Sequence, residues 1–272
     1  MIHVITLILI GGHSSRMGRD KATIVRPDGR RQIDWLGDLA RLAGGEVVLS
    51  VRQDSTPPVD LPVVIDAHPE AGPLAAFAAF HQHYPEKAAL VLSCDLFLLD
   101  EETVKHLLAG RDQTRPVTCF ANRLDGVPEP LCAIYEPAAL SQAAGWLARG
   151  ERGARRFVQA LAPRVLDLPY PAALDSANTP HELAECFSKL QHGVTGKTVN
   201  VSYEGSLKES RGADSESVMT LANTIGGLYE ELRFRFRLSR LMEQVTVSRN
   251  GVAGETADRI AEDDRITFRD RT

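Results

Sequence analysis

The sequence predicts an α/β domain followed by a smaller α+β domain, and two observations support this division. Up to Leu190, short apolar runs alternate with amphipathic stretches, which is typical of parallel strands connected by helices. After Leu190 this alternation stops, and a strand, a helix and a hairpin follow. A chain of 272 residues is long enough for two domains. We therefore expect one domain over 1–192 and another over 198–272, joined by a glycine-containing linker.

The apolar runs of the first domain are continuous, so we expect strands that are buried on both faces. These strands are expected over Val4–Ile10, Glu46–Val51, Pro62–Ile65, Ala89–Cys94, Val117–Phe120 and Leu131–Tyr135. Helices are expected over Gln32–Leu42, Leu74–Tyr84, Glu101–Leu108, Ala138–Arg149, Ala154–Leu161 and His181–Leu190. Because ligands bind at the C-terminal ends of such strands, functional residues should follow the strands directly.

The second domain shows a different order of elements. Strands are expected over Thr198–Tyr203, Gln244–Ser248 and Arg265–Phe268, with a helix near Ile225–Phe236. Asn250-Gly251 predicts a hairpin turn, because both residues readily adopt positive φ. About 75 residues suffice for a small α+β domain.

Composition and charge exclude several classes of protein. Hydrophobic residues make up 43% and charged residues 25%, which is typical of a globular protein with a core. The net charge of −5 argues against a general nucleic-acid or membrane binder, and the apolar start Met1–Ile10 is too short to span a bilayer. The four cysteines are scattered without a CxxC pair, so we expect neither disulfides nor a zinc site, and a cytoplasmic location.

The most informative segment is GGHSSRMGRDKA, which directly follows the first strand. Its glycines allow a tight backbone turn whose N–H groups can surround phosphate oxygens, and its hydroxyls and cations can add further contacts. The residues concerned are Gly11, Gly12, Ser14, Arg16 and Lys21. A surface glycine loop with incidental charges is the alternative, but the spacing of these groups favours phosphate binding.

This segment resembles the signature AGG-x-S-x-R-M-G-x-D-K of molybdenum cofactor guanylyltransferases, with Ile10 in the place of the alanine. The resemblance implies a Rossmann-like nucleotidyltransferase fold. It also implies that Arg16 and Lys21 hold the triphosphate and act in catalysis. The residues that it places around the nucleotide are Leu9, Ile10, Gly11, Gly12, Ser14, Lys21 and Ser50, and an ordinary strand-end serine is the alternative at Ser50.

Two carboxylates follow strands of the first domain. Asp95 comes after an apolar strand, and because Asp100 is the better helix cap, Asp95 is predicted to hold Mg²⁺. The family's metal aspartate falls at the same position. Asp66 follows the third strand, where one carboxylate could accept from both N1–H and N2–H of guanine, although a turn-capping role is equally consistent with the sequence.

Later segments extend the resemblance to the end of the first domain. SANTPHEL, Ser176–Leu183, is similar to the family's N-x-N-T-P-x-D-L, which implies that Asn178 also reaches the metal. Thr179 and Pro180 predict a helix start. GVPEPLCAIYEP resembles the acceptor-side strand, in which Cys132 is expected to be a core residue. A cluster of arginines could meet the acceptor phosphate or form a solvated face: Arg149, Arg152, Arg155 and Arg156.

The second domain resembles the small subunit of molybdopterin synthase, a ubiquitin-like sulfur carrier with a β-grasp fold. Such carriers end in Gly-Gly, whereas this sequence ends in Arg269–Thr272 and has its Gly226-Gly227 pair internally. We therefore expect no sulfur transfer by that mechanism. The resemblance suggests docking of other molybdenum cofactor synthesis proteins, or a relic domain.

Together with these patterns, the resemblance implies a Mg²⁺-dependent enzyme that transfers GMP from GTP to the phosphate of molybdopterin or the molybdenum cofactor and releases pyrophosphate. Use of CTP, or a sugar-phosphate acceptor, is the alternative within the same class. An inactive scaffold protein of cofactor synthesis is the alternative from another class.

Overall fold

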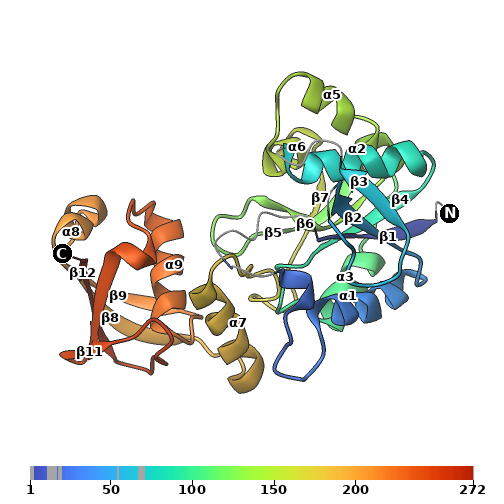
Figure 1. Cartoon of the computed structure of the whole chain (residues 1–272). Helices are drawn as coiled ribbons and strands as arrows, with labels where there is room; N and C mark the ends of the chain where they lie inside the picture. The colour runs from blue at the N-terminus through green and yellow to red at the C-terminus, as the bar shows by residue number, and fades with distance from the viewer. Residues whose placement is uncertain (1–2, 11–16, 18–19, 54, 67–70, 272) are drawn as a thin grey trace. The chain divides into compact units, whose positions relative to one another are not determined.

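The computed structural model describes residues 3–10, 17, 20–53, 55–66 and 71–271. The chain forms two compact units, Met1–Asp175 and Ser176–Thr272 (Figure 1). Each unit has its own sheet and its own hydrophobic core.

The first unit contains a seven-stranded sheet with the order β3-β2-β1-β4-β6-β5-β7. Its strands are β1 (Val4–Leu9), β2 (Val47–Arg52), β3 (Val63–Asp66), β4 (Ala88–Ser93), β5 (Val117–Ala121), β6 (Pro128–Tyr135) and β7 (Arg164–Leu166). The strands β3, β2, β1 and β4 are parallel, and β6 runs antiparallel to both of its neighbours. The predicted mainly parallel α/β fold is confirmed. The sequence did not predict β7, whose three residues are too few to show a periodicity.

Helices cover both faces of this sheet (Figure 1). They are α1 (Gln32–Ala40), α2 (Pro73–His83), α3 (Glu101–Ala109), α4 (Pro137–Leu140), α5 (Ala143–Ala148) and α6 (Ala154–Ala160). Neighbouring residues of one strand enter opposite cores: Ile8 packs with α1 and α3, and Leu7 packs with α2 and α6. This double burial explains the continuous apolar runs in the sequence.

One predicted helix, 138–149, is divided into α4 and α5. At the division, the Ser141 hydroxyl and the Gln142 amide both donate to the Ala138 carbonyl oxygen. Side chains that bond to nearby backbone groups in this way compete with the regular helical pattern. The predicted single helix was therefore wrong at 141–142.

The strand register aligns the C-terminal ends of three parallel strands. Leu9 of β1 lies opposite Ser50 of β2 on one side and Ser93 of β4 on the other. The Cys94 backbone N–H then donates to the Leu9 carbonyl oxygen at 3.2 Å, which extends the pairing beyond β4. Residues that follow β1 and β4 must therefore emerge side by side at this edge.

The second unit is a five-stranded sheet with the order β11-β10-β12-β8-β9, covered by α9 (Ile225–Phe236). Its other elements are β8 (Lys197–Tyr203), α8 (Ser206–Arg211), β9 (Ser215–Thr220), β10 (Val245–Arg249), β11 (Val252–Gly254) and β12 (Arg265–Asp270). Parallel β8 and β12 lie beside each other, and the other pairs are antiparallel. This arrangement is the predicted β-grasp fold. The predicted turn is also confirmed, since Asn250 and Gly251 have φ of 53° and 83°.

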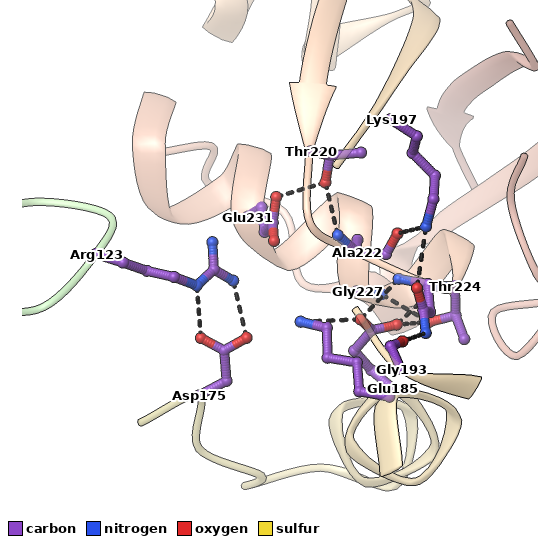
Figure 2. Close-up of polar contacts among 12 residues, drawn as sticks. Arg123, Asp175, Glu185, Gly193, Lys197, Thr220, Ala222, Thr224, Gly227 and Glu231 are labelled. Carbon is purple, nitrogen blue, oxygen red and sulfur yellow. Dashed lines mark hydrogen bonds and ion pairs between the residues drawn. The ribbon is translucent and has the colours of Figure 1, made fainter. Parts of the chain in front are cut away.

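The helix α7 (Pro180–His192) belongs to the second unit, where it packs against α9. The Glu185 carboxylate accepts hydrogen bonds from the Asn223 and Thr224 backbone N–H groups at 2.8 and 2.7 Å, and from the Thr224 hydroxyl at 2.7 Å (Figure 2). Thr224 is the N-cap of α9, so the carboxylate lies at the positive end of that helix. Lys189 Nζ lies 3.1 Å from Glu185 Oε1, and its side chain is only 1% exposed.

The internal Gly226-Gly227 pair permits this close approach of the two helices. A Cβ atom on Gly227 would clash with the Glu185 carboxyl group, and one on Gly226 would lie 3.2 Å from the His181 Cβ. His181 Nε2 also lies 3.1 Å from Glu230 Oε1 of α9. The pair therefore has a packing role.

The predicted linker at 191–197 is fixed in place. The Gly193 carbonyl oxygen accepts from the Asn223 side-chain amide at 2.8 Å, and Lys197 Nζ donates to the Ala222 carbonyl at 2.8 Å (Figure 2). The contacts divide the chain at Asp175, before α7, whereas the sequence placed α7 in the first domain. The helix pattern could not show this, because the partners of Glu185 come 38 and 39 residues later.

We expect Glu185→Ala to destabilise the second unit selectively. The substitution leaves buried N–H groups and the Lys189 ammonium without their carboxylate, which costs about 3–5 kcal/mol. Hydrogen exchange of the amides in β8 and β12, measured in the full chain, should report this loss. Glu209→Ala, at an exposed position of α8, is the control and should leave these rates unchanged. Equal exchange in both variants would refute the structural role of Glu185.

Candidate functional site

Asp95 and Lys21 lie together at the C-terminal edge of the first sheet. Lys21 Nζ is 3.9 Å from Asp95 Oδ2, and the two side chains are 11% and 14% exposed. Asp95 Oδ1 is buried and has no hydrogen-bond partner among the described residues. Burying an ionised oxygen without a donor is costly, and carboxylate oxygens are ligands that Mg²⁺ prefers. The structure therefore fits a cation at Asp95, and the magnesium role remains a prediction.

Lys21 is placed by a short 3₁₀ turn, η2 (Lys21–Thr23), which begins at Asp20. The Asp20 carboxylate accepts from the Ala22 backbone N–H at 3.0 Å and so caps the turn. The aspartate of the sequence motif thus has a structural role, since it fixes the turn that carries Lys21.

Other predicted residues of the loop lie outside the described residues, namely Gly11, Gly12, Ser14 and Arg16. Leu9 ends β1 and Ile10 follows it, at the same edge of the sheet as Asp95. Ser50, which is 4% exposed, lies opposite Leu9. Leu9, Ile10, Ser50 and Asp95 are therefore brought together as predicted from the strand ends, and their contacts with a nucleotide remain predictions.

Asp66 ends β3, two strands away from β1, and is 8% exposed. Beyond it, Gly72 begins α2 with φ 65° and ψ −152°, a conformation that is essentially restricted to glycine. This turn explains the glycine of the Gly72-Pro73-Leu74 segment. Asp66 therefore lies at the C-terminal end of its strand, as predicted, and its contact with guanine remains a prediction.

Glu129 is a candidate that the sequence analysis missed. It lies near the start of β6, which runs antiparallel to β4 with Cys132 opposite Leu92. Continuing this register past the end of β4 brings Glu129 level with Asp95. Its side chain is 13% exposed. Burial raises the pKa of Glu129, and the negative charge of Asp95 raises this pKa further. The hydrogen bond from the Asn122 amide and the positive charge of Arg155 lower it. A glutamate between two prolines at the head of an apolar strand was the available signal.

The arginine cluster has two kinds of member. Arg155 is held by Asp125 at 2.8 Å and lies 3.5 Å from Glu129, and the Arg149 guanidinium lies over the Trp146 ring at 5.4 Å. Arg152 and Arg156 are exposed, and the loop 149–156 forms a depression of about 620 Å³. An anionic group would therefore meet Arg152 and Arg156 rather than the whole cluster.

Asn178 lies in the second unit, immediately before the N-cap of α7. Its backbone N–H donates to Glu182 Oε2 at 2.7 Å, and its side-chain amide donates to the Ser176 hydroxyl at 3.2 Å. The Thr179 hydroxyl accepts from the Glu182 backbone N–H, which confirms the predicted helix start. The structure gives Asn178 a local structural role, and its metal role remains a prediction.

The end of the first unit is fixed by Arg123. Its guanidinium forms a bidentate pair with the Asp175 carboxylate at 2.7 and 2.8 Å (Figure 2). This pair holds the loop after β5 to the last residue of the unit. Bidentate pairs of this kind fix orientation as well as distance.

Cys132 is fully buried, and burial raises the pKa of its thiol, as expected for a core residue. The described helices include none that is long and apolar enough to cross a membrane.

Comparisons with known proteins agree with this geometry. Residues 6–165 match the family described as the MobA-like NTP transferase domain. Molybdenum cofactor guanylyltransferase of Ectopseudomonas mendocina is 31% identical over 183 residues, which cover 65% of this chain and 89% of that protein. A molybdenum cofactor biosynthesis bifunctional protein of Synechocystis is 35% identical over 137 residues, which cover 49% of this chain but only 39% of that protein.

A solved structure shares the fold of the first unit. The crystal structure of molybdopterin-guanine dinucleotide biosynthesis protein A from Archaeoglobus fulgidus has a TM-score of 0.55 and 20% identity, and the match covers 68% of this chain and 98% of that one. On the strength of the family match over residues 6–165, this chain belongs to the MobA-like NTP transferases.

Proposed function

We propose that this protein transfers GMP from GTP to the phosphate of molybdopterin or the molybdenum cofactor. An oxygen of the acceptor phosphate attacks the α-phosphorus of GTP, the bond from that phosphorus to the β-phosphate bridging oxygen breaks, and pyrophosphate leaves. The observation that carries the proposal is the buried Asp95 carboxylate, which faces Lys21 at the strand ends and has one oxygen to which none of the described residues donates. Family membership and the similarity to guanylyltransferases support it.

Asp95 would hold Mg²⁺, which supplies charge neutralisation of the phosphates when bound. Lys21 is fixed by η2 and would bind phosphate oxygens next to the metal. Because both side chains are largely buried, their interactions with phosphate are less screened than at a surface. Arg16 and the glycine loop would complete this binding, and positioning with charge stabilisation would account for most of the catalysis.

The base and the acceptor phosphate would contact different side chains of the first unit. Asp66, at the end of β3, would accept from guanine, and Ser50 lies on the neighbouring strand β2 opposite Leu9. Arg152 and Arg156 would meet the acceptor phosphate, because Arg155 already pairs with Asp125. We further propose that the enzyme works in the cytoplasm and that its β-grasp unit binds other proteins of cofactor synthesis.

The proposal predicts that the unaltered chain forms molybdopterin guanine dinucleotide from GTP and molybdopterin only when Mg²⁺ is present. Asp95→Asn should lower turnover by about 100-fold or more, because a carboxylate ligand is lost without a change in volume. Pyrophosphate release and the mass of the dinucleotide product measure both effects. Full activity of Asp95→Asn, or of the wild type in EDTA, would refute the metal assignment.

The choice of base is tested with Asp66. If Asp66 accepts from guanine N1–H and N2–H, Asp66→Ala should weaken GTP binding by about 1.5–3 kcal/mol and leave CTP binding nearly unchanged. Calorimetric titration with each nucleotide and Mg²⁺ measures the difference. Asp60→Ala, an exposed position before β3, is the matched control. Equal losses for GTP and CTP would show that Asp66 does not read the base.

Lys21 should act on phosphate charge alone. We expect Lys21→Ala to weaken GTP binding by about tenfold or more and to leave guanosine binding unchanged, because the ammonium faces no part of the nucleoside. Lys21→Arg should restore only part of the affinity, since a planar guanidinium does not replace a compact ammonium. Titrations of GTP and guanosine into each variant compare the effects, and wild-type affinity for GTP in both variants would contradict the assignment.

A further inference from the structure

Three side chains, one in the loop before α1 and two in its first turn, bond to the backbone of the segment that follows Asp95. Arg26 donates to the Phe97 carbonyl oxygen at 2.7 Å. The Gln32 side-chain amide donates to the Leu96 carbonyl at 3.1 Å, and the Trp35 indole N–H donates to the Leu99 carbonyl at 2.8 Å. We call Arg26, Gln32 and Trp35 the carbonyl clamp.

The members of the carbonyl clamp also hold one another. Arg26 donates to the Gln32 side-chain oxygen at 2.8 Å, and its guanidinium lies over the Trp35 ring at 4.9 Å. Arg26 is 5% exposed and Gln32 is fully buried. A buried guanidinium is costly unless its donors are used. The protein keeps this charge inside at a place where it bonds directly to the loop after Asp95.

The loop after Asp95 has little regular structure of its own. It connects β4 with α3 through single turn hydrogen bonds, such as those from the Phe97 N–H to the Asp95 carbonyl at 3.2 Å and from the Leu99 N–H to the Leu96 carbonyl at 3.4 Å. The carbonyl clamp adds three side-chain donors to this short segment. These donors fix the backbone from which the Asp95 side chain projects.

The carbonyl clamp connects the loop after Asp95 to the segment that carries Lys21. Arg26 follows η2 by a few residues, and the backbone folds back on itself there, with a bridge between Val25 and Arg31 and a bond from the Gln32 N–H to the Ile24 carbonyl at 2.9 Å. Arg26 thus joins the Lys21 segment to the Asp95 segment. The two charged groups that these segments carry are 3.9 Å apart.

We propose that Arg26, through the carbonyl clamp, is a positioning residue that sets the Asp95 carboxylate for its cation and holds it near Lys21. The inference rests on the proposed function, because that function gives Asp95 its metal role. Outer groups that orient a metal ligand change metal affinity by about 10–100-fold when they are removed. Loss of the carbonyl clamp should therefore weaken metal binding while the nucleotide pocket persists.

The test is Mn²⁺ binding to the GTP complex of the full chain, followed by electron paramagnetic resonance. Arg26→Met should weaken Mn²⁺ binding by about tenfold or more. Arg26→Lys, which can still donate to one carbonyl, should recover part of this loss. Arg41→Met is the control, because Arg41 directly follows α1 and pairs with the surface carboxylate of Asp38. The control should bind Mn²⁺ like the wild type.

Hydrogen exchange separates positioning from a general loss of structure. In Arg26→Met, exchange should increase at residues 95–99 and remain unchanged in β1 and β4. If β1 and β4 also exchange faster, the double variant Arg26→Met, Gln32→Leu replaces both buried polar partners by apolar groups and is used in its place. The kinetic counterpart is a higher Mg²⁺ concentration for half-maximal rate, with the KM for GTP at saturating Mg²⁺ nearly unchanged.

Wild-type Mn²⁺ affinity in a folded Arg26 variant would overturn the positioning role, whatever the activity. Absence of GMP transfer by the unaltered chain would instead overturn the proposed function, and the Mn²⁺ titration would still decide whether Arg26 sets the cation affinity of Asp95. Weaker Mn²⁺ binding together with local exchange at 95–99 would establish the carbonyl clamp.

Discussion

The candidate site of the first unit depends on two opposite charges, Lys21 and Asp95, that lie close together in a largely buried position. Lys21 Nζ and Asp95 Oδ2 are 3.9 Å apart, and the other oxygen of Asp95 has no hydrogen-bond partner among the described residues. The parallel pairing of β1 and β4 brings the two segments to one edge, and Asp20 and Arg26 then fix each segment there. The parallel sheet brings the two segments to the same edge, and the hydrogen bonds of Asp20 and Arg26 fix the backbone of each segment.

A second buried carboxylate, Glu185, shows the opposite arrangement. One of its oxygens accepts from the Asn223 N–H and lies near Lys189, and the other accepts from the N–H and hydroxyl of Thr224. A carboxylate whose lone pairs are used in this way is a structural element. Asp95 differs from Glu185, because its buried Oδ1 has no hydrogen-bond partner in the part of the chain that the structure describes.

The structure also separates residues that look equivalent in the sequence. Among the clustered arginines, Arg155 is held by Asp125, whereas Arg152 and Arg156 are exposed beside it. In the second unit, Gly226-Gly227 resembles the end of a sulfur carrier, but its neighbours explain it by helix packing. In both cases the role of a residue depends on the side chain that it contacts, and that side chain lies far away in the sequence.

The sequence by itself determined what depends on neighbouring residues. Continuous apolar runs predicted the parallel sheet, and Ile225–Phe236 was predicted with its observed bounds, because Thr224 caps one end and Arg237, with φ 54°, closes the other. The place of Asp95 after a strand also predicted its position at the C-terminal edge of the sheet, beside the end of β1. Only the tertiary structure assigned α7 to the second unit, brought Glu129 to the site and placed Arg26 on the Phe97 carbonyl, 71 residues away. The physical reason is that hydrophobic periodicity records which face of an element is buried, whereas a buried polar group is explained only by the distant atom that it bonds.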